Sequence, residues 1–406
     1  MKILAIAALA ISFAAVDRAE AQQRDRNLDR AIRVLRSTPL VDGHNDLPWA
    51  IREHRMRPRD VEAYDLRVRT PGHTDLERLR QGRVGGQFWS VYVPGEARDS
   101  GYARLQLEQI DIARRVIAKY PEQLSLALTA DDVRREFRRG RIGSVIGMEG
   151  GHVLENSLGV LRAYYDLGAR YMTLTHNVTL DWADAAMDTV RHGGLTRFGE
   201  EVVREMNRLG MLVDLSHASP GTMSDALNVS EAPVIFSHSS ARALANVPRN
   251  VPDSILRRLP ANGGVVMVTF VPGFISQELV DHAAARREFG DDTASSRFEQ
   301  WRAENPRPRA TLSQVADHIE HIRRVAGVDH VGIGGDFDGI SEVILGLEDV
   351  AKYPSLFAEL ARRGWSDGEL AKLAGENVLR AMETAENVAR QARSTRPAST
   401  KTIADF

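Results

Sequence analysis

Residues 39–46 have the sequence Pro-Leu-Val-Asp-Gly-His-Asn-Asp, a short apolar run that passes directly into polar residues. The apolar part predicts a buried β-strand over Pro39–Asp42. In a doubly wound open sheet, a glycine-rich phosphate-binding turn is expected after the first strand. This stretch instead ends in Gly43-His44-Asn45-Asp46, which contains no nucleotide-binding fingerprint. The sequence therefore argues against a nucleotide-binding open sheet.

Seven further apolar runs follow, separated by longer segments with helical periodicity. The eight predicted strands are Pro39–Asp42, Gly86–Tyr92, Gly143–Met148, Arg170–Leu174, Met211–Leu215, Pro233–Phe236, Gly264–Phe270 and His330–Ile333. Predicted helices include Tyr102–Lys119, Leu158–Leu167, Thr196–Leu209, Ser254–Leu259 and Leu312–Val325, with a C-terminal pair after Leu347 and Trp365. Strands alternating with crossovers in this number predict an α/β fold of the (β/α)8, or TIM-barrel, class. The charged segment Arg286–Arg309 is predicted to be an insertion between the seventh and eighth strands.

The composition of the chain excludes several classes of protein. Its 406 residues are 43% hydrophobic, carry a net charge of −2 and include no cysteine. Neither a disordered chain nor a disulfide scaffold fits these values. Nucleic acid binding would need a local basic patch, and the sequence shows none. We therefore expect a small-molecule partner and no nucleic acid.

The two ends of the chain differ from its middle. Residues 1–21 combine a positive second residue, the apolar run Ile3–Val16 and the candidate cleavage site Ala19-Glu20-Ala21. These features predict a signal peptide. The alternative is a short helix of the core. We expect a single domain over residues 22–390 and a flexible polar tail over 391–406, without a transmembrane anchor in the mature chain. Arginine accounts for 48 of the 53 basic residues, which favours a bacterial genome rich in GC. Together with the predicted signal peptide, this favours export to the periplasm or medium.

Histidines and carboxylates follow the C-terminal ends of successive predicted strands, which meet at one mouth of a barrel. His44 and Asp46 are two residues apart, so both side chains project to the same side and can chelate one ion. Glu149 follows the third strand and has two oxygens that can bridge two cations. His217 and His238 follow the fifth and sixth strands and supply imidazoles, which zinc prefers. The set predicts a binuclear metal centre that acidifies a shared water.

Three further residues are candidates for roles in the reaction. Asp336 follows the eighth strand and could take a proton from the water and pass it to a leaving nitrogen. His176 follows the fourth strand and could hydrogen-bond a developing oxyanion. Arg249 could hold a substrate carboxylate through its bidentate fork. The loops Tyr92–Tyr102 and Asp181–Gly194 are predicted to decide specificity.

Several other polar residues near these positions are not assigned to the chemistry. His152 is interpreted as a loop residue rather than an outer-sphere group. Asp42 and Asp214 are either hydrogen-bonded barrel residues or groups that orient an imidazole. His318 and His321 are expected to face solvent or the outer flank of the barrel.

Eight segments together resemble the membrane dipeptidase (renal dipeptidase) family, the M19 peptidases, which belong with the metal-dependent amidohydrolase-type barrels. These segments are VDGHNDLPW (41–49), RVGGQFWS (83–90), GMEGG (147–151), TLTHN (173–177), VDLSH (213–217), PVIFSHSS (233–240), RNVPD (249–253) and GGDFDG (334–339). The resemblance extends from about Arg30 to Val388.

The resemblance implies a dipeptidase with two Zn²⁺ ions per subunit. It implies that His44 and Asp46 hold one zinc, that His217 and His238 hold the other, and that Glu149 bridges them. A metal-bound hydroxide would then attack the peptide carbonyl.

The resemblance also implies roles for the three remaining residues. His176 is expected to contact the substrate near the scissile carbonyl, Arg249 to contact its carboxylate, and Asp336 to handle the proton. Family members cleave dipeptides, often accept a D-residue at the C-terminal position, and in some cases open β-lactam rings. A homodimer is expected by resemblance alone, without covalent linkage because the chain has no cysteine.

Two alternatives remain for the function. Another amide, lactone or ester hydrolase of the amidohydrolase type would, by resemblance, begin with His-x-His and bridge its metals through a carboxylated lysine. None of the five lysines of this chain follows a predicted strand, which argues against that subtype. The other alternative is an exported protein that binds metal or peptide without turnover, although His176, Arg249 and Asp336 are all present.

Overall fold

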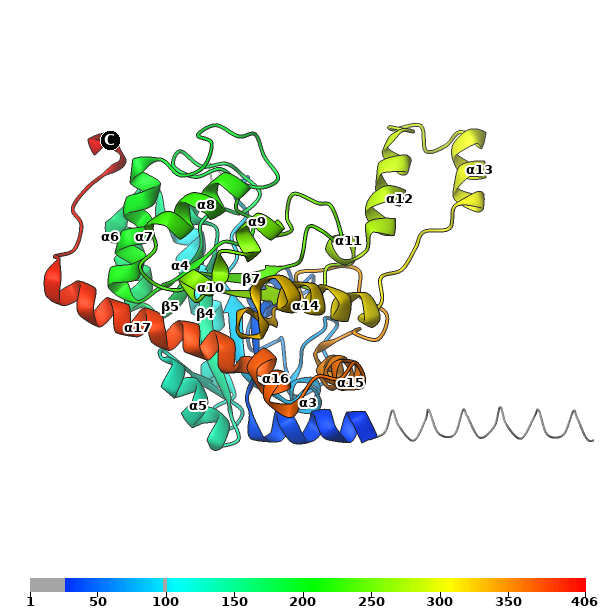
Figure 1. The fold of residues 1–406 in the computed structure, drawn as a ribbon, viewed down its shortest axis with the longest axis horizontal. Coiled ribbons are helices and arrows are strands. Elements are labelled where there is room, and N and C mark those ends of the chain that lie inside the picture. Colours follow the sequence, from blue (N-terminus) through cyan, green and yellow to red (C-terminus); the bar gives the residue numbers. More distant parts are fainter. Residues whose placement is uncertain (1–25, 98–100) are drawn as a thin grey trace, which may run out of the picture.

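A closed ring of eight parallel strands forms the centre of the protein, whose computed structural model describes residues 26–97 and 101–406 (Figure 1). The predicted signal peptide lies outside these residues. The ring strands are β1 (Leu40–Asn45), β2 (Val84–Ser90), β4 (Ile142–Glu149), β5 (Ala169–Thr173), β6 (Leu212–Asp214), β7 (Ile235–Ser239), β8 (Val265–Val268) and β9 (Val331–Ile333). Pairing of β2 with β4 and of β1 with β9 closes the ring. The predicted TIM barrel is confirmed, and each predicted strand overlaps an observed one.

A ninth strand, β3 (Leu124–Leu126), pairs with the first residues of β4. This strand was not predicted, because three residues are too few to show a strand period. It leads into helix α5 (Ala130–Arg138), which begins with a capping box at Thr129.

Helices cover the outside of the ring. They are α2 (Leu47–Arg52), α3 (Leu76–Gln81), α4 (Tyr102–Lys119), α5, α6 (Leu158–Asp166), α7 (Arg197–Leu209), α8 (Pro220–Val229), α9 (Asp253–Leu256), α10 (Leu259–Asn262), α11 (Pro272–Ile275), α12 (Gln277–Arg287), α13 (Ser296–Glu304), α14 (Leu312–Ala326), α15 (Tyr353–Arg362), α16 (Asp367–Ala371) and α17 (Asn377–Thr395). Short 3-10 turns lie at η2 (Gly151–Leu154), η3 (Val328–His330), η4 (Val350–Lys352) and η6 (Ile403–Asp405), and a π-turn at η5 (Lys372–Glu376). Residues 26–37 are also helical.

The long helices begin and end where their sequences predict. The predicted and observed bounds of α4 coincide, and those of α7 and α14 differ by one residue. Thr311 starts α14 with a capping box, and Gly210 ends α7 in a left-handed conformation. Among the residues described, none of the helices combines the length and apolarity needed to span a membrane.

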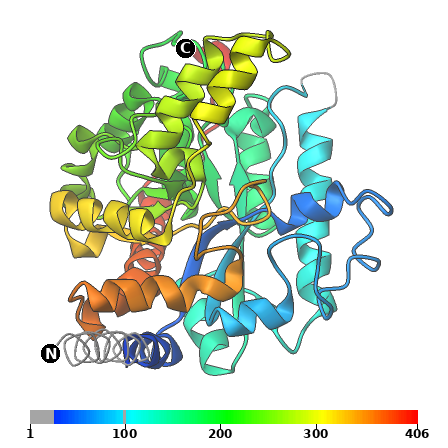
Figure 2. The ribbon, with the colours of Figure 1, turned by 90° about the vertical axis from the view of Figure 1, so that its right-hand side faces the viewer.

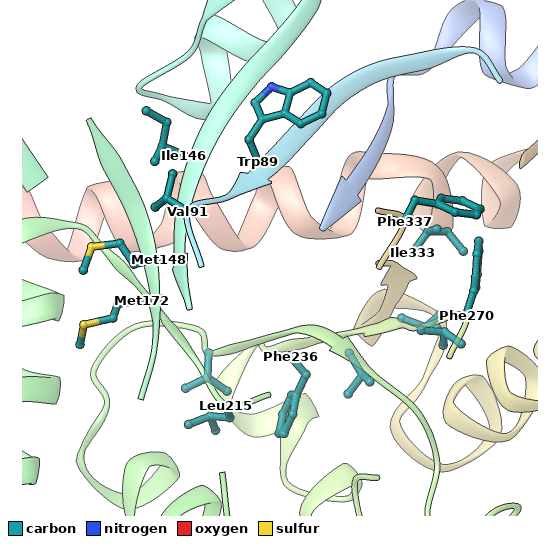
Figure 3. Close-up of a cluster of buried hydrophobic side chains, with 14 of the residues drawn as sticks. Trp89, Val91, Ile146, Met148, Met172, Leu215, Phe236, Phe270, Ile333 and Phe337 are labelled. Atoms are coloured by element: carbon teal, nitrogen blue, oxygen red, sulfur yellow. The ribbon is translucent and has the colours of Figure 1, made fainter. Parts of the chain in front are cut away.

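Buried apolar side chains fill the space between the strands and the surrounding helices. Figure 3 shows such residues around the circle of strands, among them Trp89, Met148, Met172, Phe236 and Phe337. Each of these five side chains is almost completely buried. Burial of this apolar surface holds the helices on the ring and fixes where the strand ends lie.

Helix α17 closes the N-terminal end of the barrel. Val378 and Met382 of this helix belong to the same buried cluster as Val41 of β1 and Val145 of β4. Arg380 donates to the carbonyls of Gly263 (3.0 Å) and Asp329 (2.7 Å), which precede β8 and β9. The preceding π-turn η5 brings Gly375 against the backbone of Pro39. The helix extends to Thr395, so the first five residues of the predicted tail are helical.

The segment predicted as an insertion forms an arm that projects from the barrel. It contains the end of α12 and all of α13, and Figures 1 and 2 show it at the opposite end of the molecule from the N-terminal helix. Its aromatic residues pack on one another, with the rings of Phe289 and Trp301 5.3 Å apart.

His318 and His321 lie on the outer flank of the barrel, one of the two predicted locations, but solvent does not reach them freely. His318 is 1% exposed, accepts from the amide of Ala241 at 3.1 Å and donates to the carbonyl of Ile275 at 2.9 Å. His321 is bonded to Asp253 at 2.8 Å. Of the two predicted alternatives, the outer flank is therefore the observed one, and the imidazoles join α14 to α9, α11 and the segment that contains Ala241.

Candidate metal centre and active site

The five predicted metal ligands come together at the C-terminal end of the barrel. His44 lies in β1, Glu149 ends β4 and His238 lies in β7, whereas Asp46 and His217 occupy the turns after β1 and β6. All five are less than a tenth exposed. A group of polar side chains this deeply buried needs partners that compensate for its desolvation.

Glu149 lies at the centre of the cluster and faces a different set of groups with each oxygen. Its Oε2 atom lies 3.4 Å from His44 Nε2, which in turn lies 3.2 Å from Asp46 Oδ2. Its Oε1 atom lies 3.0 Å from His217 Nε2 and 3.3 Å from His238 Nε2. The carboxylate therefore stands between two groups of ligands, as a bridge between two cations requires.

Hydrogen bonds on the far sides of two imidazoles fix their tautomers. His217 Nδ1 lies 3.1 Å from the amide oxygen of Asn177, which can only accept, so Nδ1 carries the proton. His238 Nδ1 lies 2.8 Å from Ser237 Oγ, whose own proton goes to Asp214 at 2.6 Å. Both Nε2 atoms therefore direct lone pairs at each other across 3.0 Å. Two converging lone pairs suit a shared cation.

Unpartnered buried atoms also point to metal. Among the described residues, His44 Nε2 and Asp46 Oδ1 are buried and form no hydrogen bond. Burial, together with the positive charge of Arg249, lowers the pKa of His217 and His238 and keeps both imidazoles neutral. Neutral imidazoles and ionised carboxylates are the ligand forms that divalent metals need. The residues present therefore fit the binding of divalent metal.

Replacing Ser237 with alanine should weaken metal binding by about 10- to 100-fold, because His238 then loses the acceptor that orients it. The measurement is a competition titration of Zn²⁺ against a chelator. Ser240→Ala is the matched control, since the Ser240 hydroxyl is buried and bonds to none of the described residues. Equal zinc affinity in the two variants would contradict the orienting role.

Asp336 lies beside the first group of ligands, with Oδ1 4.0 Å from His44 Nε2. Burial raises its pKa strongly, and the carboxylates of Asp46 and Glu149 add to this effect against the opposing charges of His44 and Arg249. The backbone of Asp336 is left-handed (φ 63°), an uncommon conformation outside glycine. Such strain persists where the surroundings impose it, here on a side chain turned into the site.

Gly339 leaves the space in which Asp46 and Asp336 meet. A β-carbon at this position would lie 2.3 Å from Asp46 Oδ2 and 2.7 Å from Asp336 Oδ1. Gly339→Ala should therefore displace both carboxylates and lower kcat/KM by about tenfold or more, as small misplacements at reacting groups do. Gly273→Ala is the control near the same mouth, because a β-carbon there meets nothing within 4 Å. Wild-type kcat/KM in Gly339→Ala would show that this close packing does not matter.

Arg249 is 1% exposed and lines the same cavity. It donates through Nη1 to Ser239 Oγ at 2.9 Å and through Nη2 to the carbonyl of His238 at 3.0 Å. Its Nε atom has no partner among the described residues. Burial lowers its pKa to about 10, so the guanidinium remains charged at neutral pH with donors free for an anion.

His176 and the cavity complete the site. His176 Nε2 lies 3.7 Å from Glu149 Oε1, and burial lowers the pKa of this imidazole. The cavity has a volume of about 520 Å³, the size of a small-ligand site. Its apolar wall consists of Trp49, Tyr92, Met187, Val271, Phe274 and Ile340.

The two loops predicted to decide specificity supply Tyr92 and Met187 to this wall. The other four wall residues were not predicted. They follow β1, β8 and β9 on short helices and loops, and single apolar residues there carry no signal of their own in the sequence.

The structure decides the open assignments near the site. Asp214 accepts from Ser237 and so orients His238. Asp42 accepts from Tyr353 and from the amide of Gly335, and none of its hydrogen bonds within the described part of the chain goes to an imidazole nitrogen, so it is a hydrogen-bonded barrel residue. His152 donates to the carbonyl of Val93 at 2.9 Å within the turn η2, in agreement with its interpretation as a loop residue.

A TIM barrel with imidazoles and carboxylates converging at the C-terminal ends of its strands is the arrangement of a metal-dependent hydrolase. Comparison with known proteins identifies the family within this class. Residues 28–396 match the sequence profile of the family described as membrane dipeptidase (peptidase family M19). The chain is also 44% identical over 382 residues to the dipeptidase verJ of Clonostachys rogersoniana, covering 91% of this chain and 90% of that protein. The chain belongs to the membrane dipeptidase family M19.

Solved structures agree with this assignment. The probable dipeptidase PvdM of Pseudomonas aeruginosa superposes with a TM-score of 0.78 at 25% identity, over 90% of this chain and 100% of that one. A metallopeptidase of Rhodobacter sphaeroides, liganded with a phosphinate mimic of the dipeptide L-Ala-D-Ala, gives a TM-score of 0.72 at 25% identity, over 86% and 99% of the two chains. The predictions of the family, of the fold and of a dipeptidase of the hydrolase class are confirmed.

Proposed function

We propose that the protein is a zinc-dependent dipeptidase that holds two Zn²⁺ ions per chain with Glu149 as the bridge. One observation carries the proposal: the two oxygens of Glu149 face separate groups of ligands, with His44 on one side and His217 and His238 on the other. Imidazole and carboxylate groups in this mixture suit zinc. When bound, two such ions polarise a carbonyl and lower the pKa of a shared water.

The position of Arg249 supports a short substrate with a free C-terminus. A buried guanidinium with unused donors favours a carboxylate at the wall of the cavity, and about 520 Å³ suits a molecule of dipeptide size. The apolar wall favours apolar side chains. Acceptance of a C-terminal D-residue draws support from the Rhodobacter sphaeroides relative, which holds a mimic of L-Ala-D-Ala.

Proton transfer falls to Asp336 in this proposal. Burial raises the pKa of Asp336, which favours a carboxylate that accepts a proton from the water and gives it to a leaving amine. His176 is kept neutral by burial and lies on the cavity side of Glu149, where it can hydrogen-bond the carbonyl oxygen of the substrate.

The test is hydrolysis of L,L and L,D dipeptides by the purified protein, before chelation, after chelation and after zinc is restored. We expect cleavage that is lost with the metal and regained with Zn²⁺, and the ratio of L,D to L,L rates gives the stereochemical preference. Two equivalents of bound zinc without cleavage of any dipeptide would overturn the proposal in favour of another amide, lactone or β-lactam substrate, or of binding without turnover.

We also propose that the protein is exported and acts as a homodimer in the bacterial periplasm. Export draws support from the composition of residues 1–21, and the dimer from resemblance to the family. Intact mass of the protein from the periplasmic fraction should correspond to a chain that begins at Gln22. A cytoplasmic, full-length chain would contradict export, and sedimentation as a monomer would contradict the dimer.

A further inference from the structure

A second large cavity lies at the opposite end of the barrel from the metal centre. It has a volume of about 970 Å³. It opens where β2 and β4 begin, between α3, α5 and the end of the N-terminal helix, and these elements gather at the lower end of the molecule in Figure 1. β4 runs from this cavity to Glu149, roughly 25 Å for eight residues of extended strand. The N-terminal end of a TIM barrel serves stability rather than catalysis, so the metal centre does not account for this cavity.

The floor of the cavity is apolar. It consists of Leu35, Leu76, Val84, Phe137 and Ile142. Leu76 and Phe137 are only partly buried and leave apolar surface open, whereas Leu35, Val84 and Ile142 are almost completely buried. A floor of this kind accepts hydrocarbon or aromatic groups and gains from covering them.

The rim is strongly cationic. Six arginines line the cavity together with a single carboxylate, that of Glu77: Arg36, Arg67, Arg80, Arg83, Arg138 and Arg141. Three of the six have carboxylate partners, since Arg67 pairs with Asp65, Arg80 with Glu77, and Arg141 with Glu136. The positive charge of these three is therefore largely compensated.

The other three guanidiniums are uncompensated. Within residues 26–97 and 101–406, the side chains of Arg36, Arg83 and Arg138 form no hydrogen bond or ion pair. They come from three different elements and converge on one cavity. In addition, the buried Nε of Arg141 has no partner among the described residues. Several guanidinium groups with unused donors around one cavity can bind the oxygens of a carboxylate or a phosphate.

We propose that this cavity binds a small amphipathic anion, with a carboxylate or phosphate head held by Arg36, Arg83 and Arg138 and an apolar body on the floor. Charge complementarity selects the head, because the rim has three uncompensated cations and no free carboxylate. The apolar surface of the partly buried Leu76 and Phe137 selects the body, because a fully hydrated inorganic ion would leave that surface uncovered. The site is independent of the dipeptidase reaction.

The experiment is isothermal titration of the full-length, metal-loaded protein with dodecyl phosphate below its micellar concentration. We expect one site per chain and a dissociation constant that rises about tenfold in each of Arg36→Gln, Arg83→Gln and Arg138→Gln, as loss of one charge-assisted hydrogen bond predicts. Arg33→Gln is the matched control, since Arg33 is an exposed arginine on the same N-terminal helix as Arg36 but does not line the cavity. Unchanged dipeptidase activity in all four variants shows that each is folded.

Comparison ligands separate the two parts of the proposal. Dodecyl maltoside has the same chain without a charge, and inorganic phosphate has the charge without a chain. Equal binding of dodecyl maltoside, equal affinity for inorganic phosphate, or equal affinity of all variants for dodecyl phosphate would overturn the proposal. A dimer of the protein that dissociates in Arg83→Gln would also overturn it, because the cavity would then be an interface between two copies.

Vesicles identify the source of the anion. Sedimentation with phosphatidylglycerol vesicles that is lost in Arg83→Gln but kept in Arg33→Gln would assign the head group to a lipid in a bilayer. Binding of dodecyl phosphate without sedimentation would assign it to a free amphiphile. Both results uphold the site.

Discussion

Glu149→Gln should bind fewer than two zinc ions and lose at least about a thousandfold in kcat, because metal ions contribute several kcal/mol of transition-state stabilisation. The amide has the shape of the carboxylate but lacks its charge, and its NH₂ group cannot act as a ligand. Whichever way the amide turns, one side of the cluster loses an oxygen that now lies 3.0–3.4 Å from an imidazole nitrogen. The measurements are bound zinc per chain and steady-state kinetics.

Loss of a buried carboxylate can also destabilise the fold, so a matched control is needed. Glu205 is 2% exposed, and its carboxylate binds Arg162 and Arg208 on the helical layer. Glu205→Gln should lower the unfolding temperature while zinc content and kcat stay at wild-type values. If Glu149→Gln retains two zinc ions and more than a tenth of the wild-type kcat, Glu149 is not the bridge.

Arg249→Lys should lower kcat/KM by about a hundredfold, mostly through KM, although the positive charge is kept. The guanidinium binds Ser239 and the carbonyl of His238 while other donors remain free, and a lysine ammonium cannot span these positions. Two charge-assisted hydrogen bonds to a substrate carboxylate account for an effect of this size. The measurement compares each dipeptide with its C-terminal amide.

The amide comparison separates recognition from damage to the site. The wild-type protein should prefer the free dipeptide strongly, and Arg249→Lys should cleave the dipeptide and its amide at similar, low rates. Arg258→Lys is the control, because Arg258 binds Ser224 and Asn228 away from the cavity. An unchanged kcat/KM in Arg249→Lys would remove Arg249 from substrate recognition.

The eight strands of the barrel could be predicted because each is a short apolar run, buried on both faces, between longer amphipathic segments. The bounds of helix α4 could be predicted to the residue because its buried residues recur with helical spacing. The strand β3 and the packing of His318 could not be predicted. A strand of three residues has no measurable period, and the side chain of His318 meets Ala241 and Ile275, which lie far from it in the sequence.

The convergence of the five proposed ligands could be predicted from the order of the strands, because parallel strands in a barrel end at the same mouth. The groups that orient the ligands could not. For example, the hydroxyl of Tyr171 lies 2.9 Å from His44 Nδ1, although the two residues are 127 positions apart in the sequence. No sequence pattern predicts such a pair. The same holds for the cationic cavity: residues 134–141 are rich in arginine, but nothing in the sequence shows that Arg138 and Arg141 lie near Arg36 and Arg83. Contacts of this kind follow from tertiary packing only.

The position of α17 beneath the barrel bears on when this chain can fold. β1 pairs with β9 to close the ring, and the start of β1 packs against η5. Residues near 40 therefore reach their native contacts only when residues near 333 and 375 are present. Contacts separated by about three hundred residues form late, since the entropy of closing so long a loop has to be met first. A chain that lacks its last thirty residues has every metal ligand but lacks α17, which closes the N-terminal end of the barrel. We therefore expect the active site to form only after synthesis of the whole chain.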